Sequence, residues 1–380
     1  MTKPYDIPQL PLPHDLETKA VLRQAIQANM RLAELKGSAK EIPNEHILIS
    51  TLTLQEARES SEIENIVTTQ DDLYRAGLSL PKSIISAPTK EVLNYREAIQ
   101  LGFEEVRRHK LLTTNTIVQV QRCLVGNSAG LRTQAGTTLR DQSDRVVYTP
   151  PQDPQQVRDY MSNLDHFIND LDACAIDPLI KMAIIHHQFE SIHPFYDGNG
   201  RTGRIVNILY LVANDLLDLP ILYLSRYITS HKAQYYQLIQ AIRDNAPDNS
   251  SDWEAWILFM LRGVEETAQE TLTLVRGIAR LMAEYKSVLR PLFGKQYKYE
   301  LLNNLFSHPY YTKIDFMAEA MSVQRKTATK YLNMIVDAGL LEKVQKGREN
   351  YYINTGLVKL LTHDNLTTSD KDEIIESITK

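Results

Sequence analysis

One short segment holds most of the side chains that could carry chemistry. It reads His193-Pro-Phe-Tyr-Asp-Gly-Asn-Gly-Arg-Thr-Gly-Arg204 and places a histidine, an aspartate, an asparagine and two arginines within twelve residues. Helical patterns flank it on both sides, so its glycines lie where a second helix begins. Backbone N–H groups and the helix dipole favour negative charge at such a start, which predicts a binding site for phosphate.

The charged and titratable side chains of this segment suit phosphate chemistry. Asp197 lies beside the glycines and could hold a magnesium ion against phosphate oxygens. Arg201 and Arg204 are three residues apart on one helix face, where both guanidinium groups could grip further phosphates. His193 stands at the other end, where it could take a proton from an attacking hydroxyl group. The sequence therefore predicts a phosphate site with a general base beside it.

The same glycines spell a second motif, which we reject. Gly198, Gly200 and Gly203 form G-x-G-x-x-G, the dinucleotide fingerprint. That fingerprint has meaning only after a strand and inside a βαβ unit. Here a helical pattern precedes it, and no second strand with an acidic tip follows. The chain also lacks the GK[ST] of a P-loop. Nicotinamide dinucleotides and P-loop chemistry are therefore excluded.

The segment resembles the signature of Fic-domain proteins, H-x-F-x-[DE]-G-N-G-R-x-x-R, at all eight defined positions. The resemblance extends over residues 90–262, where the helical pattern agrees. Members of that family mostly transfer AMP from ATP to a Ser, Thr or Tyr hydroxyl of a protein and release pyrophosphate. The resemblance implies these roles: His193 as general base, Phe195 as loop anchor, Asp197 as Mg²⁺ ligand, Gly198, Asn199 and Gly200 as anion hole, and Arg201 and Arg204 as contacts to the β/γ end.

Two further features follow from the resemblance. Tyr235 and Tyr236 match a tyrosine pair that flanks the adenine in related proteins. From the residues alone, the two tyrosines could equally be ordinary residues of a helix, one of which lies in the core. The stretch Thr137–Asp141 lies where the family has a flap that aligns the target segment by β-pairing, and the loose match gives no residue roles there.

A helix that ends near residue 65 carries Ser60-Ser-Glu-Ile-Glu64-Asn65. It resembles the family's inhibitory pattern [ST]-x-x-x-E-[GN]. That resemblance implies that Glu64 pairs with Arg204 and takes space needed by the γ-phosphate, because a carboxylate offers the arginine fork what a phosphate would offer. The other interpretations are a solvated acidic helix end and a glutamate that positions water for removal of AMP.

Composition sets the broad class. The chain has 380 residues, 43% hydrophobic and 23% charged, with a net charge of −5, the balance of a globular protein with a real core. Cys123 and Cys174 have no metal-type spacing, which favours a reducing compartment. The N-terminus is polar and proline-rich, unlike a signal peptide, and no apolar run approaches the roughly 20 residues of a membrane span. We expect a cytoplasmic protein that acts away from membranes.

Hydrophobic periodicity predicts a mainly α-helical fold with a small β-hairpin flap at residues 126–151 and a C-terminal winged helix-turn-helix. The resemblance implies that the helices around the motif form a Fic-type core. Residues 1–88 form an N-terminal arm and helical region, 89–285 the catalytic domain, and 286–380 the winged helix domain. Predicted helices span residues 16–36, 43–66, 89–108, 114–124, 155–170, 178–192, 201–214, 230–243, 251–285, 301–306, 314–321 and 324–337. In the first, we expect one apolar face of Leu22, Ile26, Met30, Leu32 and Leu35. We also expect a buried or capping role for His186 and His187 rather than metal binding, and core positions for Trp253 and Trp256 rather than a stacking platform.

The predicted winged helix domain is locally basic within an acidic protein. Its basic side chains on the recognition helix and wing are Arg325, Lys326, Lys330, Lys343, Lys346 and Arg348, against Asp337, Glu342 and Glu349. These suit phosphate contacts with DNA, but protein docking or a homodimer is equally consistent with the pattern.

Three functions remain open. The first is an adenylyltransferase restrained by Glu64, which uses ATP and Mg²⁺ on an unknown target protein and on itself. The second is a DNA-binding regulator whose Fic core senses nucleotide or modifies only itself. The third keeps the chemistry with another donor, although the intact DGNGR run favours a nucleoside triphosphate with magnesium.

Overall fold

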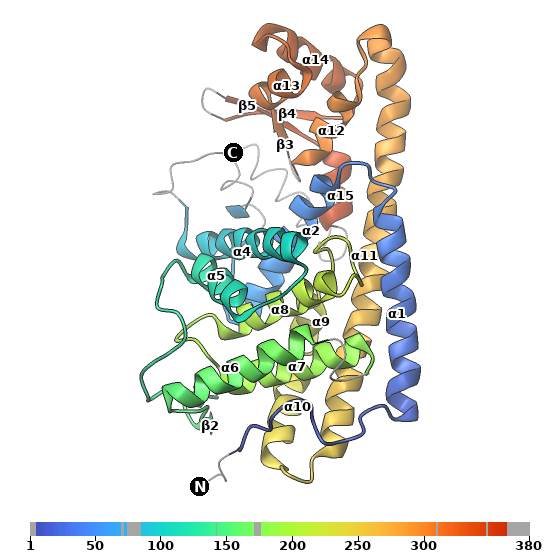
Figure 1. The fold of residues 1–380 in the computed structure, drawn as a ribbon. Coiled ribbons are helices and arrows are strands. Elements are labelled where there is room, and N and C mark those ends of the chain that lie inside the picture. The colour runs from blue at the N-terminus through green and yellow to red at the C-terminus, as the bar shows by residue number, and fades with distance from the viewer. Residues whose placement is uncertain are drawn as a thin grey trace. The chain divides into compact units, whose positions relative to one another are not determined.

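The computed structural model describes residues 5–69, 72–73, 85–141, 143–170, 176–308, 311–346 and 349–362. The fold is mainly helical, with two small antiparallel sheets (Figure 1). Contacts divide the chain into two compact units: Met1–Lys36, Thr53–Thr68 and Ser86–Gln269 form the first, and Gly37–Leu52, Thr69–Ile85 and Glu270–Lys380 form the second. The domain boundaries predicted at 88/89 and 285/286 stay a prediction.

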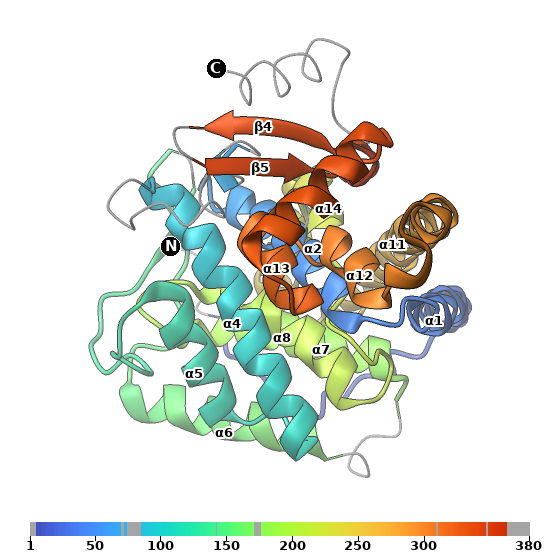
Figure 2. The same cartoon turned by 90° about the horizontal axis from the view of Figure 1, so that it is seen from above.

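The first unit is built around one buried helix, α8. Its elements are α1 (Lys19–Ala39), the second half of α2 (Glu45–Ile63), α4 (Ala87–His109), α5 (Thr114–Val125), α6 (Pro154–Asn169), α7 (Pro178–Ile192), α8 (Asn199–Ala213), α9 (Ser225–Ser230), α10 (Lys232–Asp244) and the start of α11 (Ser250–Phe293). Helix α8 packs against α4, α5 and α7, and α4 lies beside α5 in both views (Figures 1 and 2). Its apolar residues from Ile205 to Val212 are buried on all sides, as the sequence predicts.

Local signals in the sequence start the helices that surround α8. The Asp177 side chain accepts a hydrogen bond from the Leu179 N–H, and Pro178 occupies the first turn of α7. Asp153 and Pro154 begin α6 in the same way. Side chains of this kind satisfy N–H groups that a helix start leaves open, and proline lacks the group that would be unsatisfied there. These signals set where α7 begins, and α7 ends at Ile192, directly before the glycine-rich segment.

The predicted apolar face of α1 is wrong in part. Leu32 and Leu35 are buried, but Leu22, Ile26 and Met30 are 40%, 57% and 59% exposed. The buried face instead uses smaller residues at Val21, Ala25 and Ala28. The apolar residues of this helix form two stripes. The prediction mixed them by giving weight to large side chains, whereas the stripe that faces the core begins with the smaller residues Val21, Ala25 and Ala28.

The flap is a two-stranded hairpin in the first unit. Strand β1 (Leu139–Arg140) pairs antiparallel with β2 (Val146–Tyr148), with an irregularity in register between Leu139 and Arg140. The helix predicted over 230–243 is interrupted: α9 ends at Ser230 and α10 begins at Lys232, because His231 leaves helical geometry.

The second unit contains α12 (Tyr299–Ser307), α13 (Ile314–Met321), α14 (Arg325–Asp337), α15 (Thr355–Thr362) and a three-stranded antiparallel sheet. The central strand β5 (Glu349–Ile353) pairs with β4 (Glu342–Lys346) and with β3 (Tyr311–Lys313), which sequence patterns did not predict. Figure 2 shows β4 and β5 as antiparallel arrows. Helix α11 continues past the predicted end at Tyr285 to Phe293. Pro291 lies in its last turn, where proline removes one hydrogen bond without ending the helix.

No helix among the residues that the structure describes is long and apolar enough to cross a membrane.

The packing of α4 on α8 gives a stability prediction. A side chain at Gly102 would lie 2.9 Å from a Val120 methyl and still closer to Leu209. We expect Gly102→Leu to lower the free energy of unfolding by about 1–3 kcal/mol, because overpacking forces α4 away from its neighbours. Urea unfolding measures the loss, with the exposed Gln100→Leu on the same helix as control. Equal stability of the two variants would contradict this close approach.

Candidate functional site

The glycine-rich segment begins where α7 ends. His193 adopts a left-handed conformation, with φ of 48°, and its N–H donates to the Phe189 carbonyl at 2.9 Å. This conformation turns the chain out of the helix within one residue. Phe195 then inserts into the core, fully buried and close to the Phe189 ring, as the predicted anchor of the loop.

The side chain of Asn199 holds the loop closed. Its Oδ1 accepts from the Phe195 N–H and its Nδ2 donates to the Phe195 carbonyl, both at 2.8 Å. The residue is buried, and both ends of its amide bond the backbone of one residue, Phe195. The Asn199 side chain therefore closes the loop, and its backbone N–H lies at the start of α8.

Arg132 supports the loop from a distant segment. Its Nε donates to the His193 carbonyl at 2.8 Å, its Nη2 donates to the Ile192 carbonyl at 3.2 Å, and its backbone N–H donates to the Pro194 carbonyl at 2.9 Å. Only 2% of Arg132 is exposed. Arg132 thus holds three consecutive carbonyls around the histidine, two through its guanidinium and one through its backbone N–H, a role that sequence patterns did not reveal.

Helix α8 starts at the glycines. Gly198 has a φ of 76°, which favours glycine, and a side chain there would lie 2.9 Å from Val125. The Gly198 N–H donates to Asp197 Oδ1 at 2.7 Å. The Asp197 side chain is 71% exposed, beside the first turn of α8. This arrangement supplies the N–H groups, the helix dipole and one carboxylate that a phosphate with a metal ion would need.

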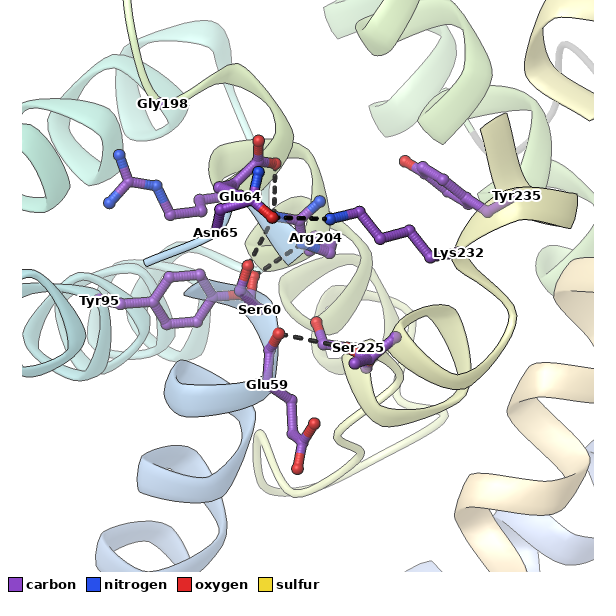
Figure 3. A network of polar contacts seen from close by, with 12 residues as sticks. Glu59, Ser60, Glu64, Asn65, Tyr95, Gly198, Arg204, Ser225, Lys232 and Tyr235 are labelled. Atoms are coloured by element: carbon purple, nitrogen blue, oxygen red, sulfur yellow. Dashed lines mark hydrogen bonds and ion pairs between the residues drawn. The ribbon is translucent and has the colours of Figure 1, made fainter. Parts of the chain in front are cut away.

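The two arginines of the segment are paired with different carboxylates. Arg201 Nη1 donates to Glu91 Oε2 at 2.7 Å, and its Nη2 lies 3.9 Å from Asp197 Oδ1. Arg204 is 2% exposed and makes its hydrogen bonds to α2. Its Nε donates to Ser60 Oγ at 2.7 Å, and its Nη2 donates to the Ser60 carbonyl at 2.9 Å and to Glu64 Oε1 at 2.8 Å. Figure 3 shows the three side chains turned toward one another.

Glu64 lies directly over the start of α8. A side chain added at Gly200 would collide with the Glu64 carboxylate, so this carboxylate covers the first turn of the helix. Burial alone would raise the pKa of Glu64, but the charge and hydrogen bond of Arg204 outweigh burial and hold that pKa below its usual range. Glu64 is therefore ionised at neutral pH and stands at the position that favours an anion.

A second glutamate, Glu56, anchors α2. It lies one helical turn before Ser60 and two turns before Glu64. Glu56 is buried and accepts from the Tyr95 hydroxyl at 2.9 Å, from the Ser225 N–H at 3.1 Å and from the Ser225 hydroxyl. Burial raises the pKa of Glu56 to about 7, against the lowering effect of its hydrogen bonds to Ser225 and Tyr95. Glu56, Ser60 and Glu64 are four residues apart, so one face of α2 presents all three.

His193 and Glu64 open onto one cavity of about 820 Å³ within the first unit. Gly200 from α8, the flap residues Leu139–Asp141 and Val147, and Lys232 from α10 also line it. Burial, with Arg243 and Arg132 adding to it, lowers the pKa of His193 to about 4. The imidazole is therefore neutral at pH 7, and its buried Nδ1 has no hydrogen-bond partner in the described part of the chain. A neutral ring can accept a proton.

The predicted tyrosine pair is divided between cavity and core. Tyr236 is 46% exposed and lines the cavity. Tyr235 is buried, and its hydroxyl lies 2.8 Å from His186 Nε2, while its ring contacts Trp256. The position of Tyr236 therefore suits direct contact with a nucleotide, whereas Tyr235 packs in the core against the Tyr236 ring. His186, His187, Trp253 and Trp256 are all core residues, as predicted.

Two residues of the cavity wall escaped sequence analysis. Glu190, three residues before His193 on α7, is buried, and its Oε1 has no hydrogen-bond partner among the described residues. Burial raises the pKa of Glu190 to about 7. Arg243, in the last turn of α10, is also buried. An apolar helix with a single acid, and a helix end with a single arginine, are common enough that neither stood out.

No group of three or more His, Cys, Asp and Glu side chains suited to a metal occurs in the described ranges. Asp197 is the acidic residue of the glycine-rich segment itself. Mg²⁺ commonly binds through one or two carboxylates together with substrate phosphates, and Asp197 fits that pattern.

Three segments match family models. Residues 22–104 match "Fic/DOC family N-terminal", residues 111–211 match "Fic/DOC family", and residues 281–357 match "Protein adenylyltransferase SoFic-like, C-terminal domain". Two similar curated proteins are protein adenylyltransferase fic-1 of Caenorhabditis elegans, 26% identical over 185 residues, and protein adenylyltransferase Fic of Nematostella vectensis, 24% identical over 203 residues. The alignments cover 48% and 50% of this chain but only 35% and 44% of those proteins, so the chain spans less than half of their length.

A solved structure gives the same result for the fold. A Fic family protein from Desulfovibrio desulfuricans G20 superposes with a TM-score of 0.56 over 90% of this chain and 98% of that chain, at 18% identity. The three matched segments together span most of the described helices, and the second contains the whole His193–Arg204 segment. The chain belongs to the Fic/DOC family.

Proposed function

We propose that this chain is a protein adenylyltransferase that moves AMP from ATP to a Ser, Thr or Tyr hydroxyl of a target protein and of itself. One observation carries the proposal: the neutral imidazole of His193 and the N-terminus of α8 open onto the same cavity, beside the flap. A base for a hydroxyl and a nest for phosphates thus face one space. The names of the similar curated proteins support this activity.

The reaction is a displacement at the α-phosphorus of ATP. The target hydroxyl oxygen forms a bond to that phosphorus, and its proton passes to the His193 imidazole. The bond between the α-phosphorus and the bridging oxygen breaks, and its electron pair leaves with pyrophosphate. The chain needs only to position the reactants in line and to stabilise the growing charge.

Each group of the site has a part in this reaction. The backbone N–H groups of Gly198, Asn199 and Gly200 would receive the α- and β-phosphates, and Arg201 and Arg204 the β/γ end. Tyr236 would stack against the adenine. Asp197 would hold a Mg²⁺ ion, which supplies positive charge against the phosphate oxygens when it is bound.

We further propose that Glu64 restrains the enzyme. Its carboxylate covers Gly200 and takes the Arg204 guanidinium, both of which a γ-phosphate would use. ATP and Glu64 therefore compete for one cation and one helix start. A second role, in which Glu64 positions water for removal of AMP, stays compatible with the same contacts.

His193→Ala tests the base. We expect the variant to bind Mg·ATP with unchanged affinity and to lose about 10²- to 10⁴-fold in AMP transfer, the usual contribution of a general base. Transfer from α-labelled ATP measures the loss, with the exposed His166→Ala as control. Retained transfer in His193→Ala would remove the assignment.

Glu64→Gly tests the restraint. We expect AMP transfer, including self-modification, to rise by about tenfold or more, because a charge-assisted hydrogen bond of roughly 1.5–3 kcal/mol no longer opposes the γ-phosphate. Glu62→Gly is the matched control, since this glutamate is exposed on the same helix end. If both variants transfer AMP at the rate of the unaltered chain, Glu64 is no brake.

A second candidate function concerns the second unit. Lys326 and Lys330 are exposed one turn apart on α14, which follows α13 through a turn at Ser322, as a DNA-reading helix would. Arg325 forms an ion pair with Asp315, and Lys343 lies over the Tyr352 ring. Arg348, also expected on the wing, lies outside the described residues. This surface supports phosphate contacts with DNA, and its winged helix character remains part of the proposal.

Reversal of both charges tests DNA binding. The double variant Lys326→Glu, Lys330→Glu should weaken binding to duplex DNA and reduce the salt dependence of the affinity, because each lost phosphate contact lowers the slope by about 1. A gel shift at several salt concentrations measures it, with Lys90→Glu on α4 as control. Binding that is absent, or equally strong in all three proteins, would contradict the second function.

A further inference from the structure

A buried arginine in the cavity wall lies within the electrostatic influence of Glu190 but makes no direct contact with a carboxylate in the described part of the chain. Arg243 lies in the last turn of α10 and is 7% exposed, and it forms no ion pair within the described ranges. A buried cation is costly unless other contacts compensate for lost water. The proposed transfer reaction gives Arg243 no contact with ATP or with the target hydroxyl, so its buried position needs another explanation.

The contacts of Arg243 join three separate elements. Its Nε donates to Ser191 Oγ at 3.2 Å, and its guanidinium carbon lies 3.9 Å from the centre of the Tyr148 ring. The Tyr148 hydroxyl closes the cluster by donating to the Ser191 carbonyl at 2.8 Å. An arginine stacked on a tyrosine face gains a cation–π attraction, which is larger when both groups are buried. Arg243, Tyr148 and Ser191 therefore form one closed cluster of α10, β2 and α7.

This cluster sits between the flap and the histidine. Ser191 lies two residues before His193, and Tyr148 is the last residue of β2. One turn earlier on α10, Gln240 Nε2 donates to the Val147 carbonyl at 3.1 Å. Helix α10 thus holds β2 at two adjacent residues and holds the end of α7 at a third point.

We propose that Arg243 is a positioning residue that fixes the flap relative to His193, so that a target segment held by the flap presents its hydroxyl to the imidazole. The inference rests on the proposed transfer reaction and adds to it. A displacement of about 1 Å between a base and its substrate can reduce a rate about 10²-fold. A fixed distance between the flap and His193 therefore preserves the rate of transfer.

The same arginine also sets the electrostatics of the histidine. Four groups act on the His193 ring besides burial: Arg243 from α10 and Arg132 from the preceding loop lower its pKa, while Glu64 from α2 and the Glu190 backbone carbonyl on α7 raise it. Loss of the Arg243 charge raises the pKa of His193 toward its ordinary value. The imidazole then becomes protonated at a higher pH, so the acid limb of the pH–rate profile moves upward.

The experiment measures self-modification with α-labelled ATP across pH in the Glu64→Gly background. Arg243→Lys keeps the charge but loses the planar guanidinium, and Arg243→Gln loses both. We expect both to lower kcat by about 10²-fold with an unchanged affinity for Mg·ATP, measured by titration calorimetry. Only Arg243→Gln should shift the acid limb to higher pH. Arg262→Lys, an exposed arginine of α11, is the matched control and should match the background.

Two milder variants probe the cluster if Arg243 variants fail to fold. Tyr148→Phe keeps the ring under the guanidinium but loses the bond to the Ser191 carbonyl, and Ser191→Ala loses the acceptor of the Arg243 Nε–H. Each should lower kcat in the same direction by a smaller factor, with ATP affinity unchanged.

The outcomes separate this inference from the function on which it rests. A Glu64→Gly protein that transfers no AMP overturns the proposed function and this inference with it. If Glu64→Gly is active, an unchanged kcat in Arg243→Lys or in both milder variants overturns the positioning role alone. A parallel loss of kcat and ATP affinity overturns it as well, because Arg243 would then act on the nucleotide.

Discussion

The candidate site depends most on the buried cation Arg204, which joins α8 to α2. Its guanidinium is almost inaccessible to water, and its hydrogen bonds in the described structure go to Ser60 and Glu64 of one helix. Breaking a buried ion pair by removing one partner leaves an uncompensated charge and is strongly unfavourable. Arg204 must therefore hold either Glu64 or another anion in its place. Under the proposed function, that other anion is the γ-phosphate of ATP at the start of α8.

The position of α2 is compatible with the proposed exchange of Glu64 for a phosphate. Glu56 fastens the helix to Tyr95 and Ser225 through a buried carboxylate, and the same face brings Ser60 and Glu64 to Arg204. The contacts of Glu56 lie in the buried scaffold, whereas the contact of Glu64 with Arg204 lies at the cavity. Glu64, about a third exposed near the helix end, is therefore the member that can leave while the rest of α2 stays in place.

The sequence predicted the parts of the site that lie close together along the chain. Asp177 and Pro178 start α7, and the fixed spacing from His193 to Arg204 carries the base, the nest and the arginines, so local chemistry alone locates them. Arg132 and Arg243 could not be found in this way, because they reach the loop from segments about 60 and 50 residues away. Their roles depend on tertiary packing.

Hydrophobic periodicity also cannot decide which of two similar faces of a helix is buried. Adjacent tyrosines on α10 cannot both face the core, and sequence alone did not decide that Tyr235 enters it while Tyr236 faces the cavity. The same ambiguity reversed part of α1, where small residues form the buried stripe and Leu22, Ile26 and Met30 are exposed. Strand β3 was missed because three residues carry too little alternation to indicate a strand.

The exchange at Arg204 is tested most directly by a crystal structure of the Glu64→Gly chain with Mg²⁺ and a non-hydrolysable ATP analogue. We predict that the triphosphate lies at the first turn of α8, with the Arg204 guanidinium within hydrogen-bonding distance of the γ-phosphate and His193 facing the α-phosphate. A triphosphate bound elsewhere, with Arg204 bonded only to Ser60, would contradict the account.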